Sequence, residues 1–256
     1  MRALAPEGLL EVWERGTQRT LPERALAFLG AALPGRKRKE LADLTVGERD
    51  AGLLALRDRS LGPDLRGRTE CPVCNSRLEF TLPIRNIYVA GEGSAEGGAP
   101  PSEGFFEQDG WSLRYRLPTA GDLAAATAGP RRREVAEVRA ELLRRSILEA
   151  NRDGAPIPAA ELLDRLPEKI VQALGERMMA DDAQAEVELR LNCARCGHAW
   201  SAYLDICGFF WAETAAMSER LLGEVHALAR AYGWNQSEIL AMSPARRQAY
   251  IERLSE

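Results

Sequence analysis

The sequence has little of what most catalytic, membrane-spanning and nucleic-acid-binding proteins need. Only 2 of its 256 residues are histidine, and aromatic residues make up 6%. No apolar run reaches the length of about 18 residues that crosses a membrane. Lys and Arg number 34 against 38 Asp and Glu, which gives a formal net charge of −4. That balance argues against a protein whose surface is built for nucleic acid.

Sequence motifs of the common enzyme classes are also missing. The chain has no phosphate-binding loop, no G-x-G-x-x-G, no G-x-S-x-G and no H-E-x-x-H. His198 and His226 are the only histidines, so few residues are available for a catalytic triad. We therefore expect a protein that is not an enzyme, acts on no small-molecule substrate and inserts in no membrane.

What the chain does have is two Cys-x-x-Cys knuckles, Cys71–Cys74 and Cys193–Cys196, with 118 residues between them. Acidic residues such as Glu7 and Glu11 interrupt the start of the chain, so we expect no secretion signal and a location in a reducing cytoplasm. Paired cysteines in that compartment favour metal binding over disulfides.

Two knuckles can place four thiolates, those of Cys71, Cys74, Cys193 and Cys196, at the corners of a tetrahedron. That set suits one Zn²⁺ with bonds of about 2.3 Å and leaves no open position, so the site would be structural. The alternatives are metal-free cysteines, or His198 in place of one ligand. A redox dithiol is disfavoured, because neither motif lies in a βαβ setting. Cys207 is expected to be a small buried core residue.

Alternating apolar residues flank both knuckles. Leu78, Phe80 and Leu82 follow the first, and Leu189 and Leu191 precede the second. This period of two predicts strands, and we expect them to pair in one small sheet.

Elsewhere the patterns predict helices. Thr45 and Glu48 have capping-box spacing, which predicts a helix from Val46 to Gly62. A second helix is predicted over residues 134–150, and a long one from about residue 208 to Gly233.

The predicted fold is α+β and mostly helical: a small antiparallel zinc-ribbon sheet, a long helical insert between its knuckles and a C-terminal helical region. The expected parts are an N-terminal helical region (1–68), the zinc-ribbon sheet (69–90 and 184–207), a flexible loop (91–110), an inserted mainly helical module (111–183) and C-terminal helices (208–256).

Four stretches give the chain a recognisable order: "LTVGERDAGLLALRDRSLG", "CPVCNSRLEFTL", "RYRLPTAGDLAAA" with "LLRRSILEANRDGAPIP", and "CARCGHAWSAYLDICGFFW" with "LLGEVHALARAYGWNQSEILAMSPARRQAYIERL". In this order the chain resembles the T-even-phage-type baseplate hub assembly chaperone family of contractile-tailed phages and contractile injection systems.

The resemblance implies a non-enzymatic protein that helps the hub of a contractile tail to assemble in the bacterial cytoplasm. Its partners would be hub or spike proteins, and it would act either transiently or as a retained component of the tail particle. The resemblance implies no catalytic residues in this chain.

The last two predicted helices are QSEILAM (236–242), capped by Asn235, and PARRQAYIERL (244–254). They are more apolar than a small solvated tail requires. We expect their apolar residues either to bind a partner or to fold back onto the long helix. They are Trp234, Ile239, Leu240, Tyr250, Ile251 and Leu254.

A zinc-ribbon accessory protein that binds nucleic acid is the alternative function. It would use two basic segments, Arg36–Lys39 and Arg131–Arg133, beside the ribbon. The acidic net charge disfavours it.

Overall fold

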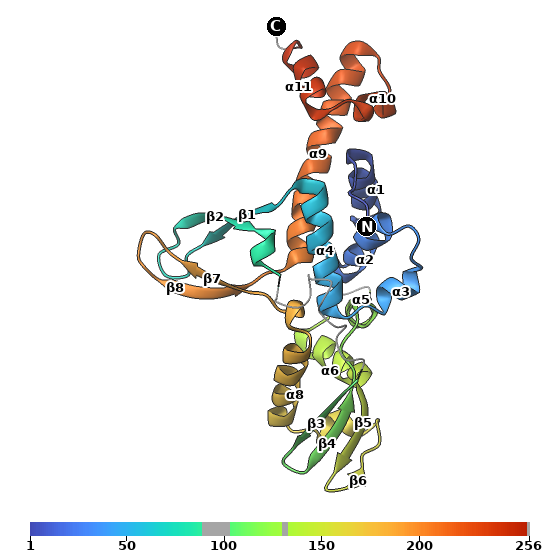
Figure 1. Cartoon of the computed structure of the whole chain (residues 1–256), viewed down its shortest axis with the longest axis vertical. Coiled ribbons are helices and arrows are strands. Elements are labelled where there is room, and N and C mark those ends of the chain that lie inside the picture. The colour runs from blue at the N-terminus through green and yellow to red at the C-terminus, as the bar shows by residue number, and fades with distance from the viewer. Residues whose placement is uncertain (89–102, 130–132, 255–256) are drawn as a thin grey trace.

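A computed structural model describes residues 1–88, 103–129 and 133–254 of the chain. Its parts are a helical body, an arm of two hairpins, an inserted module below the body and a small helical head above it (Figure 1). The mixed α+β class, the small antiparallel sheets and the C-terminal helices are confirmed.

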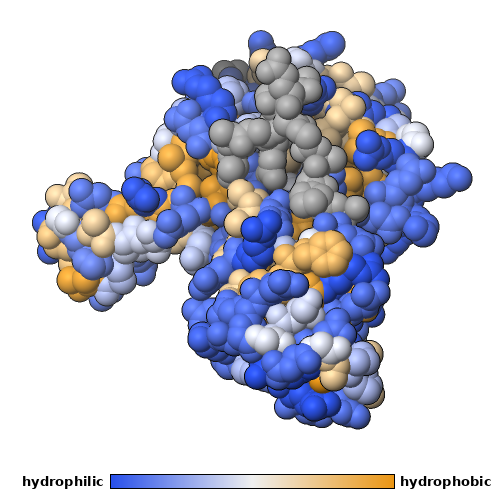
Figure 2. Space-filling view, turned by 60° about the horizontal axis from the view of Figure 1, so that its bottom comes forward, coloured by the Kyte–Doolittle hydropathy of each residue, from blue (hydrophilic) through white to orange (hydrophobic). Residues whose placement is uncertain are grey.

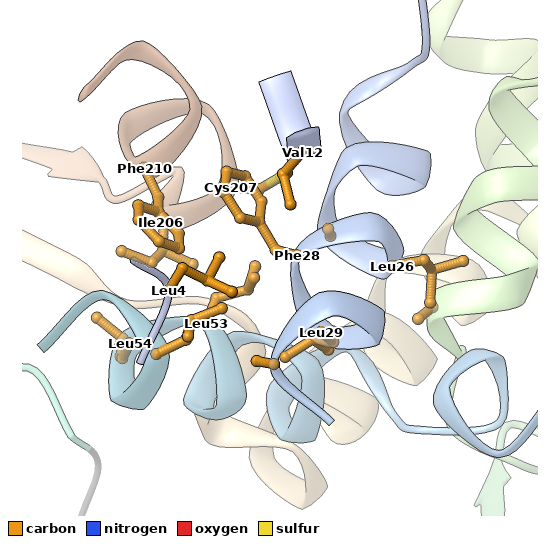
Figure 3. Close-up of a cluster of buried hydrophobic side chains, with 14 of the residues drawn as sticks. Leu4, Val12, Leu26, Phe28, Leu29, Leu53, Leu54, Ile206, Cys207 and Phe210 are labelled. Carbon is orange, nitrogen blue, oxygen red and sulfur yellow. The ribbon is translucent and has the colours of Figure 1, made fainter. Parts of the chain in front are cut away.

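The body consists of four helices and the first half of a long fifth helix. These are α1 (Pro6–Gly16), α2 (Leu21–Ala32), α3 (Arg38–Ala42), α4 (Val46–Leu61) and α9 (Ile206–Tyr232). Figure 3 shows side chains of α1, α2, α4 and α9 meeting in its core, where the rings of Phe28 and Phe210 stack with centroids 4.2 Å apart. Burial of these apolar surfaces is the main driving force for the fold of the body.

Helix α4 has the ends that its sequence predicts. The Thr45 hydroxyl accepts the Glu48 N–H at 3.2 Å, and the Glu48 carboxylate accepts the Thr45 N–H at 2.8 Å. Gly62 ends the helix at φ 95°, where a side chain would be strained. Arg57, buried in α4, pairs with Glu213 of α9 at 2.7 Å and ties these two helices together.

The arm consists of two hairpins, β1 (Asp64–Glu70) with β2 (Arg77–Pro83), and β7 (Glu188–Asn192) with β8 (Ala199–Tyr203). Short 3₁₀ turns, Ile84–Asn86 and Ala183–Ala185, join β2 and β7 to the rest of the chain. The expectation of one shared sheet was wrong: each hairpin is its own two-stranded antiparallel sheet. Each knuckle folds its chain straight back, so the incoming and outgoing strands pair with each other.

Strand β1 begins at Asp64, inside the range expected to be helical. Its inward positions are Leu65, Gly67 and Thr69, and of these only Leu65 is strongly apolar. The alternation was therefore too weak to predict a strand. Gly67 is needed there because the Phe80 ring lies across it, only 2.2 Å from where a Cβ would be.

The inserted module is less helical than predicted. It holds a four-stranded antiparallel sheet in the order β3-β4-β5-β6, formed by β3 (Gly104–Gln108), β4 (Trp111–Tyr115), β5 (Ile147–Arg152) and β6 (Ala155–Pro156). Its helices are α5 (Ala120–Thr127), α6 (Val135–Ser146), α7 (Leu162–Arg165) and α8 (Glu168–Asp181). The expected flexible loop, 91–110, is thus partly strand β3, while residues 91–102 lie outside the described part of the chain.

The helix predicted over residues 134–150 ends at Ser146, and Ile147 opens strand β5 instead. Asp153 and Gly154 both have positive φ, 50° and 84°, and fold β5 back onto β6. Ile147 and Ala150 are buried in the core of the module. The helical pattern of the sequence continues past Ser146, but strand pairing in the hairpin and burial in this core make residues 147–152 a strand.

The module joins the body at the first turn of α4. Thr45 and Thr119 form an isolated β-bridge, and the Asp182 carboxylate accepts the Gly47 N–H at 2.9 Å. Asp182 is buried, and this burial raises the pKa of its carboxyl group although the Gly47 N–H lowers it. Two contacts of the module therefore meet at one helix end.

The head is built from the end of α9, α10 (Gln236–Ala241) and α11 (Pro244–Glu252). Gly233 ends α9 in the left-handed conformation at φ 73°, as predicted. Asn235 and Ser243 cap the next two helices by accepting backbone N–H groups. No helix in the described residues is long and apolar enough to cross a membrane.

We predict that Gly47→Ala lowers the free energy of unfolding by about 1–3 kcal/mol, as overpacking does. A Cβ at this position would lie 2.0 Å from Asp182 Oδ1. Denaturant titration followed by circular dichroism measures the change. Gly175→Ala in α8 is the control: its Cβ would meet nothing within 4 Å, so we expect no loss of stability. Equal effects of the two variants would contradict the close contact.

Candidate metal centre

The four cysteines of the two knuckles come together at the tip of the arm. Cys71 Sγ lies 3.6 Å from Cys196 Sγ, and Cys74 Sγ lies 3.6 Å from Cys193 Sγ. All four sulfurs lie within 4.8 Å of one another. Cys71 and Cys193 are buried, Cys74 is half-buried and Cys196 is exposed. The cluster thus takes one buried and one more accessible sulfur from each hairpin.

The two knuckles have the same backbone geometry. In the first, Cys71 N donates to Ser76 O at 3.0 Å and Asn75 N to Cys71 O at 2.9 Å. In the second, Cys193 N donates to His198 O and Gly197 N to Cys193 O, both at 2.8 Å. Asn75 and Gly197 both have positive φ, 55° and 72°. Asn and Gly adopt this conformation most easily, so they let each turn close around its cysteines.

The thiols of the cluster differ in acidity. Hydrogen bonds from the Ser76 side chain and backbone lower the pKa of Cys74 to about 6. The His198 backbone N–H lowers the pKa of Cys196, but partial burial and the neighbouring thiols oppose it and raise the value to about 12. Four thiolates this close repel one another, so all four ionise together only around a cation.

The donor set fits a tetrahedral metal ion. Bonds of about 2.3 Å to four sulfurs would place each pair of sulfurs about 3.8 Å apart, close to the distances in the cluster. The four cysteines can therefore hold one metal ion, and zinc is compatible with them. Such an ion would have no free coordination position, so its contribution would be to the shape of the arm.

His198 is not part of the cluster. Its ring stacks along Trp200 with centroids 6.0 Å apart, and its carbonyl closes the second knuckle. Ser76 was missed by the sequence argument, although its hydroxyl lies 3.2 Å from Cys74 Sγ and 3.3 Å from Arg195 Nη1. A hydroxyl two residues after a knuckle cysteine is the signal that could have identified it.

Cys207 lies away from the cluster in the core of the body, as expected. Its thiol donates to Leu21 O at 3.1 Å, and burial raises its pKa to about 12. Such a thiol stays protonated and unreactive at neutral pH. His226 is on the exposed side of α9.

The residues predicted to bind a partner fall in two groups. Ile239 and Leu240 are buried, and Leu240 packs against Leu10 of α1 and Leu221 of α9. Trp234 and Tyr250 form an aromatic cluster with Tyr232, with ring centroids 4.6 to 5.6 Å apart. Ile251 is half-buried and Leu254 is exposed. The first pair holds the head to α9 and α1, and the others remain accessible.

The structure does not bring the first basic segment beside the cysteines. Residues 36–39 lead into α3, on the opposite side of α4 from the hairpins in Figure 1. Lys39 of this segment pairs with Asp43 at 2.7 Å. Residues 131 and 132 lie outside the described part of the chain.

The fold and the cluster together define a helical body that carries a metal-knuckle arm and an inserted α+β module. Residues 9–211 match the protein family described as T4 bacteriophage base plate protein. This match covers most of the chain, which therefore belongs to that family. It includes the arm, both knuckles and the inserted module, and it ends in the first turns of α9. Searches of curated proteins and of solved structures found no match.

We predict that the purified protein contains about one zinc per chain, since four thiolates saturate one tetrahedral ion. Cys71→Ser and Cys193→Ser should each lose most of this zinc, and Cys207→Ala should keep it. Elemental analysis by mass spectrometry measures the metal. A folded wild-type protein without zinc, or zinc loss in Cys207→Ala alone, would contradict the assignment.

We also predict that metal removal loosens the arm and leaves the body folded. The cluster lies at the tip of the hairpins, whereas the body has its own buried core. After chelation, amide hydrogen exchange should speed up in residues 64–83 and 188–203 and stay unchanged in α4 and in α9 up to Leu228. Faster exchange throughout the body would show that the metal supports the whole fold.

Proposed function

We propose that this chain is a non-enzymatic assembly factor or component of the baseplate hub of a contractile phage tail or contractile injection system. The family match over residues 9–211 is the observation that carries the proposal, because it places the chain among baseplate proteins. Such a protein works by contacts with other baseplate proteins. We propose hub or spike proteins as the partners, met in the bacterial cytoplasm during assembly.

We further propose that the cysteine cluster binds one structural Zn²⁺. The sulfur distances of 3.6 Å and the like backbone geometry of the knuckles support this. Zinc suits this role because it has no redox chemistry of its own and accepts four sulfur ligands. The ion would fix the relative position of two hairpins that share no backbone ladder.

The accessible residues of the head are one proposed contact surface of this function. Ile251 lies on α11 and Leu254 just after its end, next to the aromatic cluster of Trp234 and Tyr250. Aromatic and aliphatic side chains of this kind often anchor protein–protein interfaces. Their neighbours Ile239 and Leu240 hold the head in place, so the head is a preformed surface.

We predict that the tagged chain co-purifies with a hub or spike protein when the two are co-expressed. Ile251→Glu with Leu254→Glu should reduce the amount recovered by about tenfold, because it places two charges in an apolar contact. These positions are half-buried and exposed, so the head should stay folded. Quantitative mass spectrometry of the eluate measures recovery.

Gln248→Glu on the exposed side of α11 is the matched control and should leave recovery unchanged. No association of the wild-type chain with any hub or spike protein would contradict the proposed function. Normal recovery of the double variant would contradict only the contact surface in the head.

A further inference from the structure

A groove of about 480 Å³ runs over the outer side of α2, between α1 and α3. Its floor is apolar. The floor is made of small residues of α2, namely Ala27, Gly30 and Ala31. Larger buried side chains form the sides: Leu4 from the start of the chain, Val12 from α1 and Leu41 from α3.

Gly30 carries no side chain into the groove. A Cβ built on it would meet only Leu41 Cδ1, at 3.9 Å, so the space above the glycine is free. Ala27 and Ala31 beside it are only half-buried. A row of small residues on a helix lets a second helix approach closely, which a floor of larger side chains would prevent.

The rim of the groove is strongly basic. Five arginines line it, Arg2, Arg15, Arg19, Arg36 and Arg38, and Glu11 is the only acidic residue that lines it. All five side chains are exposed. This concentration of positive charge stands out in a chain whose formal net charge is −4.

Most of that charge is not neutralised within the described chain. Arg15 pairs with Glu11 at 3.4 Å, and Arg2 is held by the Ala31 carbonyl at 3.0 Å. Arg19, Arg36 and Arg38 make no ion pair with a described residue. Glu23 is close enough to feel Arg19 and Arg38, but its carboxylate is used in capping Thr20.

The apolar floor and the basic rim together indicate what kind of segment would bind in the groove. An apolar floor over a helix, with arginines along the edge, is complementary to an amphipathic helix whose apolar stripe is flanked by Asp or Glu. A nucleic acid would use the arginines but not the aliphatic floor, and the lining residues include no aromatic side chain for base stacking.

We propose that this groove docks an acidic amphipathic helix of another baseplate protein. The proposal deepens the proposed function, because it names the chemistry of one partner segment. It places a contact on the body, lined mainly by residues that match the family, and on different elements from the head.

Fluorescence anisotropy with labelled synthetic peptides, tiled across hub, spike and tube proteins of contractile tails, tests the docking. The full chain should bind at least one peptide that carries an apolar stripe with acidic flanks. Raising NaCl from about 50 mM to about 300 mM should weaken that binding, because salt screens exposed charges.

Two kinds of variant should remove the binding. Arg36→Glu with Arg38→Glu should raise the dissociation constant by about tenfold or more through charge repulsion. Gly30→Leu should do the same by filling the floor, and it should not destabilise α2, because leucine favours a helix more than glycine does.

Matched controls separate these effects from general ones. Gly30→Ala fits the free space and should bind like the wild type. Arg85→Glu with Arg230→Glu changes the same amount of charge at exposed arginines outside the groove, and it too should bind normally.

Four further outcomes would overturn the docking proposal, and each points to a different explanation. If whole hub or spike protein binds equally well to the wild type and both groove variants, the groove is not the contact and the proposed function stands. If no baseplate protein or peptide binds, the proposed function fails as well. Salt-sensitive binding of duplex DNA lost in the Arg36/Arg38 variant would assign the rim to nucleic acid, and self-association lost in Gly30→Leu would assign the groove to a second copy.

Discussion

The contact of Asp182 with the first turn of α4 is the constraint on which the arrangement of the molecule depends. Its carboxylate takes the Gly47 N–H at 2.9 Å and lies beside the Thr45 hydroxyl at 3.3 Å, so one buried acid closes the helix end and ends the inserted module. The β-bridge of Thr45 with Thr119 holds the module there at a second point. Because α4 also packs on α9, this joint connects the module to the helices of the body.

Because these hydrogen bonds hold the module to the body, a metal ion in the cysteine cluster is not needed for that purpose. In the sequence the two knuckles flank the insert, so a zinc ion that they share could be expected to close its base. The cysteines instead lie at the tip of the arm, away from the joint (Figure 1), and backbone and carboxylate hydrogen bonds close the base. In the space-filling view of Figure 2 the arm protrudes from the body. A metal ion at that position stiffens a projection, and its coordination energy adds little to the core.

Local signals in the sequence predicted much of the fold, and tertiary contacts account for the rest. Capping residues such as Thr45 and Asn235 act within one turn, so the helix starts they predict are the ones observed. The cysteine cluster was predictable because knuckle spacing fixes ligand geometry locally. Strand β5 was not, since Ile147 continues a helical pattern and becomes a strand only through pairing with β4. The arginine groove was hidden because three segments build it.

The Gln184 side chain donates to the Ile87 carbonyl at 3.4 Å, so the chain leaves for the inserted module and returns at the same place. The module is therefore a closed excursion from the arm. Without it, about 20 residues would separate the two knuckles, the spacing of an ordinary zinc ribbon. A chain shortened in this way would keep a continuous arm, but it would lose α5, whose Ala120 is buried in the core of the body.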